Sequence, residues 1–367
     1  MEQVRIKFNT TDRPEFFQEL RKRVNDYFKE NNKSKHANAN MVIKTVFMLS
    51  LYFVPFLFIL LNISENSWII LGLWILMGLG MAGIGLSIMH DANHGAYSKN
   101  KNVNKYLGYL INLVGGSAIN WKIQHNVLHH SFTNIEGHDE DIDAGNLMRF
   151  SFAQKRHKMH RLQQIYAWFL YGLLTISWSI KKDFLQLERY KNKDLIKTQG
   201  ISYNKAFIRL LLAKTFYLGY VIALPVIFSS QTLWLTLIFY FIMHFVCGFT
   251  LSTIFQAAHL VSETNFPEPN KEGKMENNWA IHQLYTTANF ARKNLALSWY
   301  VGGLNYQIEH HLFPNICHVH YRKISKIVKS TALEFNLPYY SHRTFIGALI
   351  SHGKLLTKLG KYDTLSI

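Results

Sequence analysis

The sequence predicts an all-α integral membrane protein, and three observations indicate this class. The first is that 49% of its 367 residues are hydrophobic. The second is that long apolar segments with few charges alternate with strongly basic segments, which is typical of membrane proteins. The third is that the apolar segments come in two pairs, joined by only LNISENS and SSQT, so each pair is expected to form a helical hairpin. The four expected transmembrane helices are roughly 41–62, 68–89, 207–229 and 231–255.

The distribution of basic residues predicts the orientation of these helices. Neither hairpin tip contains Lys or Arg, whereas the N-terminal segment, the 90–205 connection and the region after 256 hold nearly all 40 of them. By the positive-inside rule, these regions and both termini lie on the cytoplasmic side of a multi-pass membrane protein. The membrane would be the cytoplasmic membrane of a bacterium or the endoplasmic reticulum of a eukaryote. Lys44, Arg209 and Lys214 are exceptions, and we expect each to snorkel from the cytoplasmic end of its helix.

Four further segments are expected at the membrane surface. The apolar stretches 106–120 and 165–180 are marginal for crossing a bilayer, and one crossing by either would split the basic regions between two faces. We therefore interpret them as interfacial or re-entrant. The segments 13–30 and 321–336 are basic and amphipathic, with Phe17, Leu20, Val24 and Phe28 on one face of the first. Both suit helices on the cytoplasmic membrane surface, and both equally suit a face packed on a cytosolic domain.

Composition limits the partners and the domain organisation. The net charge of +17 points to an anionic membrane surface rather than nucleic acid, because no zinc-finger or RNA-binding signature is present. The two cysteines, Cys247 and Cys317, lack metal-site spacing, and the first 40 residues contain no apolar core of a signal peptide. The expected division is a cytosolic amphipathic segment (1–40), a membrane domain (41–322) and a basic, helical cytosolic segment (323–367).

The histidines gather in short motifs, and their spacing predicts metal binding. The motifs are HDANH, HNVLHH, FQAAHL and QIEHH. Side chains at i and i+4 of a helix project from one face, and neutral imidazole binds iron, zinc, copper or nickel. Eight imidazoles are too many for one four-coordinate zinc, so they suit two metal ions with room for oxygen or water. The eight candidate ligands are His90, His94, His125, His129, His130, His259, His310 and His311.

The expected topology brings these motifs to one membrane face. Two spans precede HDANH, and no further span lies between HDANH and HNVLHH. Two more spans precede FQAAHL and QIEHH, so all four motifs reach the same side of the membrane. Isolated histidines elsewhere are interpreted as structural: His244 as a buried hydrogen-bonding group rather than a tunnel-lining residue, and His318 and His320 as part of a surface turn. The same interpretation applies to His36, His157, His160, His342 and His352.

HDANH, HNVLHHSFTN and NYQIEHHLFP resemble, in order and spacing, the three histidine boxes of the membrane fatty acid desaturase family. The resemblance extends from the first span to about residue 322. It implies that the box histidines bind two iron ions, and His259 matches an additional family ligand after the last span. Gln307 replaces the first histidine of the third box, which is similar to the front-end branch (delta-6-like, linoleoyl-CoA desaturase-like). That branch desaturates between an existing double bond and the carboxyl end.

The same resemblance suggests residues that support the ligands. WAIHQLYTTANF (279–290) is family-like, with Gln283 and Asn289 as groups that orient ligands, and Gln307 is expected to orient water or a ligand. The acidic run GHDEDID (137–143) either supplies carboxylates to ligand histidines or is a solvated loop or helix cap, and Asp91 has the same two interpretations. No catalytic residue beyond the metal centre is assigned.

The implied function is an O₂-dependent desaturase that introduces a cis double bond into a fatty acyl chain. The acyl carrier could be coenzyme A, acyl carrier protein or a lipid. Front-end relatives often carry a fused cytochrome b5 domain with an HPGG motif, which this sequence lacks, so a separate donor such as a ferredoxin or cytochrome b5 is expected.

Other functions remain open from the sequence. A membrane hydroxylase on the same di-iron frame would share the histidine boxes and differ in product. A zinc-dependent membrane hydrolase would bind zinc and need no reductant. A metal transporter would place its ligands near the bilayer midplane, whereas these motifs lie beyond the ends of the spans. A non-enzymatic scaffold would not need eight convergent imidazoles.

Overall fold

The computed structural model describes residues 6–363 and is mostly helical, with two strands of two residues each. Its contacts divide the chain into two compact units, each of which is described by itself. The membrane unit comprises residues 37–125 and 168–253. The terminal unit comprises residues 6–36, 126–167 and 254–363.

Four helices are long and apolar enough to cross a membrane, which confirms the number expected from the sequence. The stretches 106–120 and 165–180 instead form short helices, and the described part of the chain contains no further helix of membrane length and hydropathy. The four candidate spans are Ala39–Leu60, Ser67–Asn93, Tyr203–Phe228 and Leu233–His259.

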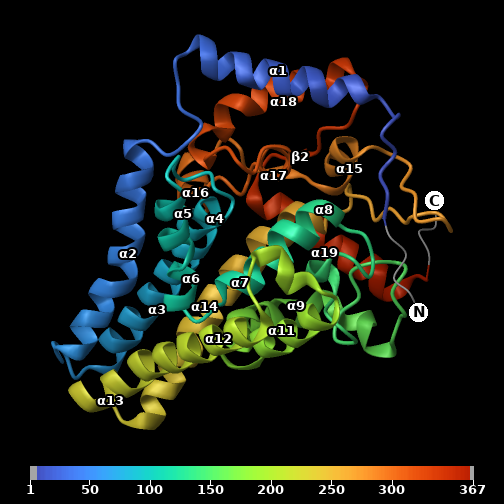
Figure 1. Cartoon of the computed structure of the whole chain (residues 1–367). Coiled ribbons are helices and arrows are strands. Elements are labelled where there is room, and N and C mark those ends of the chain that lie inside the picture. The colour runs from blue at the N-terminus through green and yellow to red at the C-terminus, as the bar shows by residue number, and fades with distance from the viewer. Residues whose placement is uncertain (1–5, 364–367) are drawn as a thin grey trace. The chain divides into compact units, whose positions relative to one another are not determined.

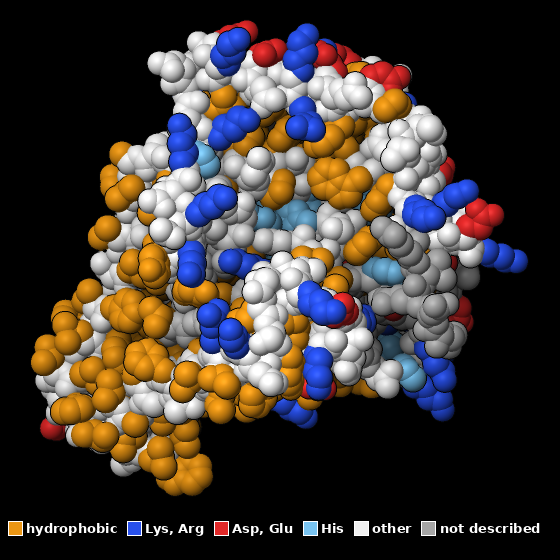
Figure 2. All heavy atoms as spheres, viewed as in Figure 1, with side chains coloured by type: hydrophobic (Ala, Val, Ile, Leu, Met, Phe, Trp, Pro, Cys, Tyr) orange, Lys and Arg blue, Asp and Glu red, His pale blue; other side chains and the backbone are white. Residues whose placement is uncertain are grey.

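In the membrane unit, α2 (Ala39–Leu60) packs along α3 (Ser67–Gly83). A Cβ atom at Gly80 would lie 2.7 Å from the backbone nitrogen of Tyr52, so only glycine permits this close approach. Hydrophobic side chains cover the surface at the end of this unit that carries α13 (Leu224–Phe228), as Figure 2 shows, which suits contact with lipid. The other helices are α4 (Met89–Asn93), α5 (Lys101–Gly108), α6 (Leu110–Leu113), α7 (Ala118–Trp121), α10 (Leu174–Ser177), α11 (Asp183–Asn192), α12 (Tyr203–Leu218), the 3₁₀ segment η6 (Leu195–Gln199) and the π-helices η1 (Ile84–Ile88), η5 (Trp178–Lys182) and η7 (Gly219–Ala223).

Three segments cross from one unit into the other along the chain. They are α9 (Gln163–Gly172), α14 (Leu233–His259) and the π-helix η2 (Lys122–His129).

The prediction that Lys214 snorkels is wrong. Its ammonium group is buried, pairs with the carboxylate of Asp183 and donates to two backbone carbonyl groups at 2.6 Å. A buried charge is tolerated inside a membrane bundle when a partner satisfies it, and that partner lies 31 positions away in the sequence. The same prediction is wrong for Lys44, which is also buried, whereas Arg209 is exposed, as snorkelling requires.

In the terminal unit, α1 (Pro14–Glu30) lies alongside α18 (Tyr321–Glu334), as Figure 1 shows. Leu20 and Val24 of α1 and Ile324 of α18 are buried in one hydrophobic core. The structure therefore follows the second of the two alternatives for these amphipathic segments, with the apolar faces packed on protein. The other elements are α8 (His130–Phe132), α15 (Trp279–Thr286), α16 (Leu295–Tyr300), α17 (Gln307–Leu312), α19 (Phe345–Lys361), the 3₁₀ segments η3 (Glu140–Ile142), η4 (Lys158–Leu162) and η8 (His318–His320), and the parallel strands β1 (Asn289–Phe290) and β2 (Ser341–His342).

His318 and His320 do not belong to a surface turn, contrary to prediction. Both are buried, and His320 makes an edge-to-face contact with Phe28 at a centroid distance of 5.1 Å. The Nε2 atom of His320 lies 3.0 Å from the carbonyl oxygen of His36. The sequence could not indicate this burial, because it depends on the packing of α1 over η8.

Candidate metal centre

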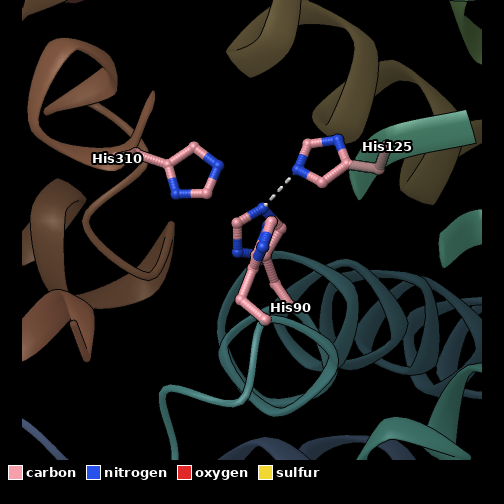
Figure 3. Close-up of side chains that lie close together, drawn as sticks. His90, His125 and His310 are labelled. Carbon is pink, nitrogen blue, oxygen red and sulfur yellow. Dashed lines mark hydrogen bonds between the residues drawn. The ribbon is translucent and has the colours of Figure 1, made fainter. Parts of the chain in front are cut away.

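Three candidate ligands gather in the membrane unit. His90 lies on α4 directly after the π-helix η1, His94 ends α4, and His125 lies on the π-helix η2. The Nε2 atoms of His90 and His125 are 3.1 Å apart, and Figure 3 shows the two rings facing each other. The ring of His94 lies 4.9 Å from that of His90 and 5.1 Å from that of His125. π-Helical turns are rare and occur frequently at functional sites.

The spacing of these nitrogens fits a shared ion. Two imidazole nitrogens bound about 2.1 Å from one octahedral ion, at right angles, would be separated by about 3 Å. The rings of His90 and His125 are buried, and Trp121 stacks on His125 with a centroid distance of 4.5 Å. This packing restricts the ring of His125 and excludes water from one of its faces.

A second group lies wholly within the terminal unit. It comprises His129 at the end of η2, His259 at the end of α14 and His311 on α17. All three side chains are fully buried, and one nitrogen atom of each lies within 4.8 Å of the others. Side chains from segments up to 182 positions apart in the sequence thus lie close together, as the metal-site hypothesis requires.

The ring of His129 is held by the acidic run. Its Nδ1 atom lies 3.0 Å from the Oδ2 atom of Asp139 and 3.5 Å from that of Asp141. Asp139 also accepts hydrogen bonds from the backbone N–H groups of Asn134 and Asp141, so it both caps η3 and orients a candidate ligand. The helix-cap alternative for this run therefore holds for Asp139, and its support of a metal ligand stays a prediction. Burial alone would lower the pKa of His129, but the two carboxylates raise it above its usual value.

The other two rings are oriented by different acceptors. The Nδ1 atom of His311 lies 2.8 Å from the Oε1 atom of Gln283, which also accepts from the Thr133 hydroxyl at 2.9 Å. The Nδ1 atom of His259 lies 3.4 Å from the carbonyl oxygen of Thr286. In each ring an Nδ1–H facing an acceptor leaves the Nε2 lone pair for a metal ion. The Nε2 atom of His259 is buried and makes no hydrogen bond with any of residues 6–363.

The remaining two candidate ligands belong to a third group, which includes His311. The Nε2 atoms of His130 and His310 are 2.9 Å apart, and the ring of His130 stacks on that of His311 at 4.4 Å. The hydroxyl oxygen of Tyr321 lies 3.3 Å from the Nδ1 atom of His310. The Trp279 indole donates to the backbone carbonyl of His130 at 2.9 Å, which fixes the start of α8.

The predicted supporting residues differ in what surrounds them. Asn289 accepts a hydrogen bond from the backbone N–H of Ile308 at 3.0 Å, so it holds the first turn of α17. Gln307 begins α17 and is buried, and its Oε1 atom makes no hydrogen bond within the described chain. Asp91 is buried on α4 between His90 and His94. The roles of these three side chains in orienting ligands stay predictions.

Sequence reasoning missed Glu309, which lies beside His310 in the third box. Its carboxylate is fully buried and accepts hydrogen bonds from Tyr339 at 2.8 Å and Asn289 at 2.9 Å. Burial raises the pKa of Glu309 to about 7, although these hydrogen bonds oppose the shift. An acidic residue between apolar and imidazole side chains in QIEHH was the available signal.

The donor set fits a transition-metal ion. His129, His259 and His311 are buried imidazoles whose Nδ1 atoms face acceptors, which is the arrangement that metal-binding histidines adopt. Imidazole nitrogen suits iron, zinc, copper and nickel alike. The geometry thus supports metal binding without selecting the metal.

Comparisons with known proteins identify the family that this chain matches. Residues 66–343 match the family described as "Fatty acid desaturase". The chain is 36% identical to the sn-1 linoleoyl-lipid 6-desaturase of Synechocystis sp., over 97% of this chain and 98% of that protein. It is 35% identical to the sn-1 linoleoyl-lipid 6-desaturase of Arthrospira platensis, over 94% and 92% of the two chains. It is 34% identical to the acyl-lipid (8-3)-desaturase of Physcomitrium patens, over 97% of this chain and 74% of that protein.

Proposed function

Since this chain belongs to the fatty acid desaturase family, we propose that it introduces a cis double bond into the acyl chain of a membrane lipid, using O₂ and an external electron donor. Membership confirms the resemblance that the histidine boxes predicted. The relatives named above act on linoleoyl-lipid or acyl-lipid substrates, which favours a lipid over coenzyme A or acyl carrier protein as the acyl carrier.

The arrangement of imidazoles in the terminal unit carries this proposal. One iron ion would be held by His129, His259 and His311, and another by the group in the membrane unit. His130 and His310 are further candidate ligands. When bound and reduced, the two irons supply the oxidising power that removes hydrogen from an unactivated methylene pair, which no side chain can do. The group in the membrane unit is His90, His94 and His125.

The protein's own residues orient the ligands and exclude water. Asp139 and Gln283 accept from the Nδ1–H groups of His129 and His311, so each ring keeps the tautomer that presents Nε2. The full burial of these side chains keeps the site dry, which prevents loss of the oxidant to solvent. Gln307 orients water or a ligand from the first position of α17.

The proposed regiochemistry is that of the front-end branch. The Gln307 marker supports it, and so do the positional names of the relatives, 6-desaturase and (8-3)-desaturase. The four spans form two hairpins, with both termini and the histidine boxes on the cytoplasmic side. The division at residues 40 and 322 into a cytosolic segment, a membrane domain and a second cytosolic segment stays a prediction.

Expression in a host that lacks polyunsaturated lipids tests this function. Fatty acids are supplied, double-bond positions are mapped by mass spectrometry, and the purified protein is analysed for metal. We expect a new double bond on the carboxyl side of an existing one, and about two irons per chain. A mono-hydroxylated acid as the only product would replace desaturation with hydroxylation, and zinc without iron would indicate a hydrolase.

A ligand variant and a matched control sharpen that experiment. His129→Ala removes a buried candidate ligand and is expected to abolish the product. His342→Ala removes a histidine that pairs with Glu263 at 3.2 Å and belongs to none of the three histidine groups, and it is expected to retain the product. Wild-type product from His129→Ala would contradict the ligand assignment.

A further inference from the structure

Helix α18 carries an exposed basic face. Among the described residues, none of its exposed basic side chains forms an ion pair with a carboxylate. The acidic residue Glu334, at the end of the helix, is already paired with Arg23 of α1 at 2.7 Å. Lys and Arg side chains lie over α1 and α18 in Figure 2. The basic face of α18 consists of Arg322, Lys323, Lys326 and Lys329.

The opposite face of α18 is already buried. Ile324 and Val328 lie in the hydrophobic core that α18 shares with α1. A helix that inserts below the headgroups needs a broad apolar face, and the apolar face of α18 is packed on α1, so only electrostatic attraction to a bilayer remains to it. Its basic face therefore fits the acidic surface of a soluble protein better than a membrane.

The first residue of α18 contacts a candidate ligand of the metal centre. Tyr321 is its first residue, is buried, and places its hydroxyl oxygen 3.3 Å from the Nδ1 atom of His310. One aromatic side chain thus separates the surface at Arg322 from a proposed iron ligand.

A second contact links the basic surface to the same box. The guanidinium of Arg292 donates to the Tyr339 hydroxyl at 3.4 Å, and Tyr339 donates to Glu309, the neighbour of His310. Arg292 is half-buried and accepts a hydrogen bond at its backbone carbonyl from the Tyr306 hydroxyl at 2.6 Å. Arg292 is thus a second basic group beside the third box.

The proposed reaction requires electrons from outside the acyl chain. The conversion of –CH₂–CH₂– to –CH=CH– supplies two electrons and two protons, whereas reduction of O₂ to two waters consumes four of each. A donor must supply the other two electrons, and two protons come from solvent. An iron–sulfur cluster held by four cysteine thiolates would need more than the two cysteines of this sequence.

We propose that the basic face of α18, together with Arg292, is the docking surface for the electron donor, an acidic one-electron carrier protein whose electrons enter through Tyr321 and His310. This inference rests on the desaturase function proposed above. Long-range attraction between the basic face and an acidic carrier raises the rate of productive encounter and makes that rate dependent on salt.

Charge reversal at two positions tests the proposal. The double variant K323E/K326E is compared with K354E/K358E, which makes the same charge change on the exposed face of α19 in the same unit. The measured quantity is the rate of iron reduction by a reduced plant-type ferredoxin, and separately by dithionite, in full-length protein reconstituted in lipid. We expect K323E/K326E to lower the ferredoxin rate at low salt by about 10-fold or more and to flatten its salt dependence. We expect K354E/K358E and the charge-conserving K323R/K326R to retain it.

The dithionite arm separates failure of docking from failure of the proposed function. Dithionite needs no docking surface, so K323E/K326E should form wild-type amounts of product with it. Absence of a double bond from wild-type protein with dithionite would overturn the desaturase function itself. An unchanged ferredoxin rate in K323E/K326E, or an equal loss with dithionite, would overturn the docking proposal. A loss that appears only when anionic lipid is present would indicate a membrane contact and would overturn it as well.

Discussion

Helix α14 carries two fully buried histidines that are built into the protein in different ways. Both nitrogens of His244 are engaged, Nε2 with the Tyr217 hydroxyl at 2.7 Å and Nδ1 with the Thr175 hydroxyl at 3.1 Å. His259 engages only Nδ1, and its ring lies 4.7 Å from that of His129 and 4.8 Å from that of His311. Burial therefore does not distinguish a ligand from a structural histidine. On α14 the distinction lies in the buried Nε2 atom of His259, which makes no hydrogen bond among residues 6–363 and lies beside other imidazoles.

The largest expected effect is at His259. His259→Ala removes one of three proposed ligands from a buried site, so iron content should fall from about two ions per chain to about one, and product yield by about 100-fold or more. Metal analysis and lipid analysis of the same preparation check both expectations. The control is His244→Gln on the same helix, which should keep both irons. Full iron content in His259→Ala would remove the distinction between the two histidines.

The next effect concerns the carboxylate that holds His129. Asp139→Asn keeps the size of the side chain and removes its charge, so the Nδ1–H of His129 loses a charged acceptor. Metal affinity should fall about 10- to 100-fold, measured by competition with a chelator. Asp143→Asn makes the same change at an exposed position of the same acidic run and should have little effect. Equal losses of metal affinity in the two variants would show that Asp139 acts only through the overall negative charge of the loop.

The sequence predicted local features well. The four spans follow from length and apolar composition, and the histidine motifs follow from spacing along the chain. The packed faces of α1 and α18 were one of two alternatives, because periodicity shows that a face is apolar and not what covers it.

Features that depend on distant partners could not be predicted. The burial of Lys214 depends on Asp183, and the selection of Asp139 from an acidic run depends on where the His129 ring points. The π-helix η2 is a further example, since HNVLHH was interpreted with α-helical spacing. Within η2 the ligand nitrogens of His125 and His129 still lie within 4.8 Å of each other, as that spacing predicted. The sequence could not show that His125 also meets His90, with their Nε2 atoms 3.1 Å apart.

A third buried histidine, His352 on α19, lies outside the proposed metal ligands, and its burial should make the stability of the protein depend on pH. Its Nδ1 atom lies 2.6 Å from the Leu260 carbonyl oxygen, and burial lowers its pKa to about 4. Because the folded protein disfavours the charged ring, its stability is complete above about pH 6.5 and falls as the pH decreases towards 4. The expected loss at pH 5 is about 2 kcal/mol, measured as a lower unfolding midpoint in detergent. His352→Gln should show a flatter pH dependence, and an unchanged slope in that variant would assign the acid sensitivity to other groups.

The smallest effect is expected at His244, the structural histidine of α14. His244→Phe leaves the hydroxyl groups of Tyr217 and Thr175 without their ring partner. Hydrogen bonds between membrane helices contribute about 1 kcal/mol each or less, so the unfolding midpoint should fall slightly. Iron content should stay at the wild-type value, because neither ring nitrogen is available to a metal while both are hydrogen-bonded. His244→Gln restores one polar partner and should recover part of the lost stability. Loss of iron from His244→Phe at full thermal stability would place His244 among the groups that hold the metal centre, and hydrogen bonding at both nitrogens would no longer identify a structural histidine.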